Sequence, residues 1–164
     1  MHQSILGCVN GWDDNPTGTG CDILSSSNMT LGEIKNNHNT VSGGSLSTVY
    51  DKLEELIDPI ASRWHCYTAY FVNIIPKKSE RFNKLFTPTI PKSGGRKCAT
   101  NEMIRIIDGA SFYTIVTGEY DALKNLFNVL PHVIEDVLKK KFGNTSYSLP
   151  QLDEYKKYFN MAFE

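Results

Sequence analysis

Three charged side chains near the start of the chain have the types and the spacing of a metal site. Asp22 lies in one short apolar run and Glu33 and Lys35 lie in the next, and the polar residues 25–28 separate the runs. This pattern predicts two strands joined by a tight turn. Alternate residues of a strand share a face, so Glu33 and Lys35 point together while Ile34 points into the core. If the strands pair, Asp22 lies beside Glu33, and two carboxylates with one ammonium suit a hard divalent cation and its bound water.

An acidic residue two positions before a lysine is a weak signal by itself. The chain contains the pattern a second time, as Glu154-Tyr155-Lys156. That copy lies in a stretch with helical spacing, where residues i and i+2 diverge. Only the first copy has a strand context and an aspartate on the preceding strand. On the residues alone, an incidental ion pair on a solvated hairpin face remains the alternative to a metal site.

The elements that would position these residues follow from the apolar pattern. Residues 1–19 are rich in glycine and predict an irregular arm, and apolar residues at three- and four-residue steps after Ser45 predict a helix that reaches Ile60. The other predicted elements are strands at 64–75 and 103–107 and helices at 111–117, 122–141 and 151–163. Pro131 should kink or divide the helix at 122–141. The order predicts an α/β fold, a mixed β-sheet flanked by helices, in a single domain spanning residues 1–164.

Composition limits the class of protein. The chain has 164 residues, 40% of them hydrophobic and 21% charged, which is typical of a globular domain. It has no apolar run long enough to span a bilayer and no basic N-terminal signal region, so we expect a cytoplasmic protein without membrane contact. The four cysteines are far apart and lack zinc-ligand spacing, which predicts buried free thiols.

Positive charge is concentrated in one segment. The formal net charge of the chain is -1, yet residues 77–97 hold seven lysines and arginines against Glu80 alone. The segment has two internal prolines and no apolar period, so it predicts a long loop. Such local charge favours contact with a polyanion.

With the order of elements and the charged residues together, the chain resembles the PD-(D/E)XK nuclease fold, whose hallmark is Asp on one strand and Glu-x-Lys on the next. It is similar in particular to a family of type II restriction endonucleases, several of whose members cut GGNCC sites. The resemblance covers roughly residues 2–140. The stretches that carry it are GCDI (20–23), GEIKNNHNT (32–40), TVYDKLEELI (48–57), AYFVNIIPKKSERFNKLFTP (69–88), IRIIDGASFYTIVTGEYDAL (104–123) and LPHVIEDVL (130–138).

The resemblance implies magnesium-dependent cleavage of double-stranded DNA at a short GC-rich palindrome, by a homodimer, with a cognate DNA methyltransferase in the same system. Asp22 and Glu33 would hold Mg²⁺, and the carbonyl of Ile34 would add a ligand. Lys35 would orient the attacking water and offset charge on the phosphate.

Two groups of residues are candidates for DNA contact. Those leaving the Glu33 strand are Asn36, Asn37, His38, Asn39 and Thr40, followed by Ser45 within the helix start at 42–45. Those of the basic segment are Lys77, Lys78, Arg81, Asn83, Lys84, Arg96 and Lys97. The alternatives are turn-forming asparagines, a capping serine and a solvated basic loop.

The chain departs from the family pattern at two places. Cys21 stands where the motif has proline, and family members carry helical sequence ahead of the segment that resembles HQSILGCVNGW. The resemblance therefore predicts a truncated or processed form, or another element that covers that side of the sheet. The alternative functions are a repair or junction nuclease on the same fold, a DNA-binding module without activity, and a protein-interaction domain.

Overall fold

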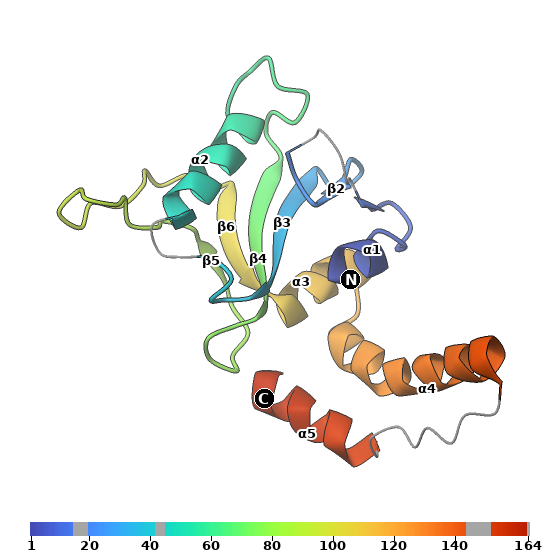
Figure 1. Cartoon of the computed structure of the whole chain (residues 1–164). Coiled ribbons are helices and arrows are strands. Elements are labelled where there is room, and N and C mark those ends of the chain that lie inside the picture. Colours follow the sequence, from blue (N-terminus) through green and yellow to red (C-terminus); the bar gives the residue numbers. More distant parts are fainter. Residues whose placement is uncertain (15–19, 42–44, 144–151, 164) are drawn as a thin grey trace.

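The computed structural model describes residues 1–14, 20–41, 45–143 and 152–163, and a mixed β-sheet forms its centre (Figure 1). The strands of this six-stranded sheet are, in chain order, β1 (Asp13–Asp14), β2 (Ile23–Ser25), β3 (Thr30–Asn37), β4 (Thr68–Ile75), β5 (Asn83–Leu85) and β6 (Ile104–Asp108). Their order across the sheet is β1-β2-β3-β4-β6-β5. The central strands β3, β4 and β6 are parallel, and the outer pairs are antiparallel. The predicted mixed α/β fold is confirmed.

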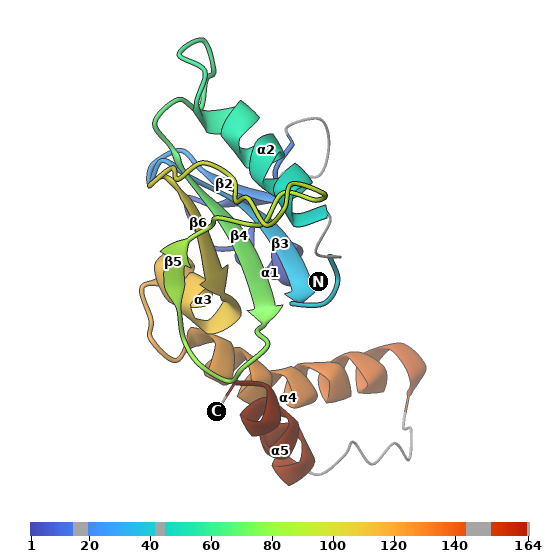
Figure 2. The same cartoon turned by 90° about the vertical axis from the view of Figure 1, so that its left-hand side faces the viewer.

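Helices cover both faces of the sheet. They are α1 (His2–Leu6), α2 (Leu46–Ile57), α3 (Gly109–Thr117), α4 (Ala122–Phe142) and α5 (Leu152–Phe163). Helix α2 connects the parallel strands β3 and β4 and lies over one face, while α1 and α3 lie over the other (Figures 1 and 2). Helices α4 and α5 lie beyond the end of the sheet toward which β3 and β4 run (Figure 2). None of the described helices is long and apolar enough to cross a membrane.

Two buried clusters hold the layers together, and β4 contributes to both. Phe71 packs with Tyr50 and Leu53 of α2, whereas Tyr70 and Val72 pack on the α3 side. Successive residues of a strand point to opposite faces, so a continuous apolar run is required where both faces are covered. The prediction of a central strand at 64–75 is therefore correct in kind, although the strand begins at Thr68 and residues 64–66 form a turn.

The N-terminal segment is more ordered than the sequence predicts. Residues 1–19 were expected to be irregular, but α1 and β1 form within them, and residues 15–19 lie outside the described part of the chain. Trp12 is 3% exposed and packs edge-on against Phe112 at a centroid distance of 5.9 Å. The glycine-rich composition indicated a loop because the apolar contacts that order the segment come from α3, more than 90 residues away in the sequence.

Four further expectations need correction. The basic segment contains strand β5, antiparallel to β6, at the edge of the sheet, where exposed side chains give no apolar alternation. Helix α4 continues through Pro131, so the proline does not divide it, while a kink at Pro131 stays a prediction. Helix α2 ends at Ile57, which leaves Ile60 88% exposed. Cys8 and Cys66 are exposed free thiols, while Cys21 and Cys98 are buried as expected.

Gly109 fixes the approach of α3 to the sheet. A Cβ atom at this position would lie 2.5 Å from the carbonyl oxygen of Ile74 in β4. We expect Gly109→Ala to lower the free energy of unfolding by roughly 2–4 kcal/mol, because backbone atoms must move apart. Urea unfolding measures this change, with Ser111→Ala as a control in the same helical turn. Equal stability of the two variants would contradict the prediction.

Candidate active site

The hairpin of β2 and β3 brings the two candidate carboxylates together. Ile23 is in register with Gly32, and the backbone N–H of Asp22 donates to the Gly32 carbonyl oxygen at 2.8 Å. Asp22 therefore lies opposite Glu33, as the sequence predicts, although it directly precedes β2 and does not lie within the strand. The Asp22 carboxylate accepts a hydrogen bond from the backbone N–H of Ile34 at 2.7 Å. This bond holds the side chain against β3.

Glu33 is the most enclosed acidic group of the site. It is 8% exposed, and each of its carboxylate oxygens meets one ammonium group. Lys35 Nζ lies 2.8 Å from Oε1, as the shared strand face predicts. Lys52 Nζ, from α2, lies 3.0 Å from Oε2. Lys52 was not among the predicted site residues, because the position of α2 over the hairpin is a tertiary feature.

The two carboxylates differ in their electrostatics. Burial pushes the pKa of Glu33 up, but the hydrogen bonds and charges of Lys35 and Lys52 outweigh it, so the pKa lies below its ordinary value. Burial raises the pKa of Asp22 above its ordinary value, against the Ile34 hydrogen bond, and the negative charge of Glu33 adds to the rise. Without a cation, the structure thus favours a charged Glu33 and disfavours a charged Asp22.

The donor set fits a magnesium ion. Within the described residues, no group of three or more His, Cys, Asp or Glu side chains is arranged to hold a metal. The available side-chain donors are the hard oxygens of Asp22 and Glu33. Mg²⁺ typically binds through one or two carboxylates and keeps several waters, whereas zinc sites need more protein ligands. Asp22 and Glu33 would hold the ion.

A cavity of about 310 Å³ opens beside these residues. The N-terminus lies close to the C-terminal end of β3 (Figure 2). The cavity is lined by Met1, His2, Gln3, Asp22, Ile34, Lys35, Asn36 and Thr40. It therefore joins the carboxylate, the lysine and two of the predicted DNA-contact residues in one space.

Comparison with known proteins gives the chain its family. A family model described as the Eco47II restriction endonuclease matches residues 1–139. The chain belongs to this family. The type II restriction enzyme Eco47II of Escherichia coli is 48% identical over 163 residues, which are 99% of this chain and 68% of that protein. The type II restriction enzyme Sau96I of Staphylococcus aureus is 31% identical over 151 residues, which are 91% of this chain and 56% of that protein. No solved structure matches the chain.

Membership of the Eco47II family assigns the chain to the site-specific endonucleases, which act on DNA. The resemblance to type II restriction endonucleases is confirmed. Asp22, Glu33 and Lys35 all lie within the matched residues. Their assignment as the catalytic group remains a prediction, now supported by their convergence in space.

The polar residues after Glu33 leave the sheet at the mouth of the cavity. Strand β3 extends through Asn37, and the turn that follows is closed by hydrogen bonds from His38 N–H to the Ile75 carbonyl and from Thr40 N–H to the Asn37 carbonyl. Asn36 and Asn39 are exposed. Ser45 is exposed directly before α2, and residues 42–44 of the predicted helix start lie outside the described part.

The basic segment is divided between several places. Asn83 and Lys84 lie on β5, three strands and therefore about 14 Å from β3. The Asn83 side-chain oxygen accepts from Arg105 Nε at 2.6 Å, and Lys84 lies over the Phe82 ring. The exposed members of the segment outside this strand include Lys77, Lys78, Arg96 and Lys97. The structure thus separates two groups that the sequence treated as one loop.

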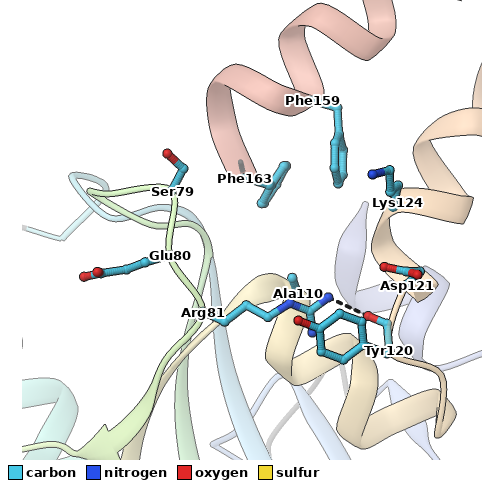
Figure 3. Close-up of a pocket in the computed structure, with 9 residues that line it drawn as sticks. All are labelled: Ser79, Glu80, Arg81, Ala110, Tyr120, Asp121, Lys124, Phe159 and Phe163. Carbon is cyan, nitrogen blue, oxygen red and sulfur yellow. Dashed lines mark hydrogen bonds between the residues drawn. The ribbon is translucent and has the colours of Figure 1, made fainter.

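Arg81 lines a different cavity, of about 330 Å³, where the basic segment meets α3, α4 and α5 (Figure 3). Its guanidinium lies 3.7 Å from the centroid of the Tyr120 ring and donates to the Tyr120 carbonyl and to Thr114. No lining residue of this cavity belongs to the Asp22–Glu33 group. A base contact by Arg81 would require it to leave these partners.

Asn73 is a second residue that the sequence analysis missed. It is in register with Lys35 on the neighbouring strand and shares the α2 face with Phe71. Among the described residues, its Oδ1 atom is buried without a hydrogen-bond partner. A buried carbonyl oxygen on the residue that pairs with Lys35 is an acceptor suited to a water or to the Lys35 ammonium. No local sequence pattern reveals it, because parallel pairing depends on the crossover through α2.

The raised pKa of Asp22 predicts a gain in stability on neutralising it. A carboxyl group whose pKa is raised in the folded state contributes stability at pH values below its ordinary pKa of 3.8. This contribution is lost as pH rises through the pKa of the folded state. Asp22→Asn keeps the acceptor for Ile34 and removes the charge. In chelator at neutral pH, we expect Tm to rise by a few degrees, since about 1 kcal/mol corresponds to about 2–4 °C.

The test is the difference in Tm between the variant and the parent protein across pH 4–8. The difference should shrink as pH falls, because the raised pKa makes the parent Asp22 increasingly neutral at acidic pH. Asp51→Asn, on the outer side of α2, is the matched control. A constant difference, or a lower Tm at neutral pH, would contradict the prediction.

Proposed function

We propose that this chain is a magnesium-dependent type II restriction endonuclease that cleaves double-stranded DNA at a short GC-rich palindrome. The observation that carries the proposal is the convergence of Asp22, Glu33 and Lys35, the first and last of which line one cavity, in a chain of the Eco47II family. Both relatives named above are type II restriction enzymes.

The chemistry follows from what the side chains can do. Asp22 and Glu33 bind the ion, which supplies positive charge and an acidified water when it is present. Lys35, held 2.8 Å from Glu33, hydrogen-bonds the attacking water and offsets negative charge that develops on the phosphate. The residues at the cavity mouth, Asn36 and Thr40 among them, bind the DNA backbone or base edges.

We also propose that the active form is a homodimer in the cytoplasm, and that a cognate DNA methyltransferase belongs to the same system. A palindromic site is naturally bound by a two-fold symmetric protein. Sedimentation of the protein with and without a cleavable duplex tests the dimer.

Digestion of a long, fully sequenced duplex, with and without Mg²⁺, tests the function. We expect discrete, magnesium-dependent ends that share one motif, which reveals the recognition sequence. Scattered or structure-dependent ends would favour a repair or junction nuclease instead. Binding that falls steeply with salt, without cleavage in any divalent metal, would favour a DNA-binding module. No DNA binding even at low salt would favour a protein-interaction domain.

A further inference from the structure

We propose that Lys52 is a second lysine of the active site, which exchanges its contact with Glu33 for a DNA phosphate when the metal binds. The inference deepens the proposed function and rests on it. Its starting point is the ion pair between Lys52 Nζ and Glu33 Oε2 at 3.0 Å.

Lys52 occupies the carboxylate oxygen that a cation would use. Lys35 already holds Oε1, so Oε2 is the oxygen through which Glu33 would reach a metal, and Lys52 covers it. A doubly charged ion on this oxygen repels an ammonium at hydrogen-bond distance. The ion and Lys52 therefore compete for this oxygen.

The two lysines differ in how freely they can move. The Lys35 side chain is 26% exposed and starts from the central sheet. The Lys52 side chain is 45% exposed and starts from the outer layer, on α2. A lysine is a compact charge on a flexible four-carbon stem. Once released from Glu33, Lys52 has the reach and the freedom to meet a phosphate oxygen, whereas Lys35 stays with the reacting group.

The charge balance favours this exchange. Without metal, the negative charges of Asp22 and Glu33 are matched by Lys35 and Lys52, all four of which interact. When the ion binds, the site gains two positive charges and Lys52 loses its counter-ion. A DNA phosphate then supplies the negative charge, so the metal and the DNA favour each other's binding.

The test compares Lys52→Gln with Lys52→Arg and with Lys139→Gln. Lys139 forms an ion pair with Glu135 on α4, outside the site, and is the matched control. Titration with Mn²⁺ followed by electron paramagnetic resonance, without DNA, reports metal affinity. We expect Lys52→Gln to bind Mn²⁺ about two- to fivefold more tightly, because no ion pair has to break.

DNA binding should change in the opposite direction. In Ca²⁺, Lys52→Gln should bind a short duplex more weakly, with a salt slope smaller by about 1, and Lys52→Arg should restore both. An ion pair that only stabilises the fold predicts a lower Tm with unchanged metal affinity and salt slope, and this result would overturn the inference. Failure of the parent protein itself to bind Mn²⁺ or cleave DNA would instead overturn the proposed function.

Discussion

Glu33→Gln is expected to reduce the rate of DNA cleavage by about 1,000-fold or more, which corresponds to about 4 kcal/mol of transition-state stabilisation. The substitution removes one of the two carboxylates and leaves Lys35 and Lys52 facing a neutral amide. Two unbalanced ammonium groups then repel the ion that Asp22 alone must hold. Single-turnover cleavage of a duplex that carries one site, at several Mg²⁺ concentrations, measures the loss.

The same variant should also be less stable without metal, unlike Asp22→Asn. A carboxyl group whose pKa is lowered in the folded state, such as Glu33, contributes stability at pH values above its ordinary pKa of 4.5. This stability is lost as pH falls through the pKa of the folded state. Removing the Glu33 charge therefore lowers Tm at neutral pH. Glu55→Gln, an exposed position on α2, is the control for both measurements. Cleavage by Glu33→Gln at a rate within tenfold of the parent rate would contradict the assignment of Glu33 as a metal ligand.

Lys35→Ala is expected to lower the cleavage rate by at least ~100-fold while DNA binding is retained. Lys35 lines the cavity next to Asp22, where the attacking water must be oriented. Its contribution is needed when charge develops on the phosphate, so the loss belongs to the chemical step and not to binding. Rapid-quench cleavage under saturating protein gives the rate, and fluorescence anisotropy in Ca²⁺ gives the affinity.

Lys139→Ala, on α4, removes an exposed and ion-paired lysine outside the site and should cleave at the parent rate. A Lys35→Ala protein that cleaves normally would show that Lys35 only balances the charge of Glu33. A protein that no longer binds the duplex would show that Lys35 is mainly a phosphate contact. Either result would change the role assigned to it.

The part of the site that could be predicted from sequence is the part made by one hairpin. Asp22 and Glu33 are eleven positions apart, and an antiparallel turn leaves a local pattern that sets their register. Lys35 follows from the two-residue period of the same strand. The continuous apolar run of β4 likewise predicted a strand buried on both faces.

The parts that could not be predicted depend on how distant elements pack. Lys52 reaches Glu33 because α2 crosses above β3, and Asn73 meets Lys35 through parallel pairing after that crossover. Neither arrangement leaves a short-range signal. Arg81 illustrates the same limit in the basic segment, since its stacking on Tyr120 depends on the turn between α3 and α4. The positive charge of residues 77–97, taken alone, indicated that the whole segment forms one DNA-contact surface.

The pairing of Glu33 with two lysines has a consequence for how the protein meets changes in ion supply. The charged residues of the site already balance without the ion, so the protein can fold and remain folded in a chelator. An ion at a concentration equal to its Kd adds only about 0.4 kcal/mol to the free energy of unfolding. Under the proposed magnesium dependence, depletion of the ion would therefore stop cleavage reversibly and leave a folded protein that regains activity when the ion returns.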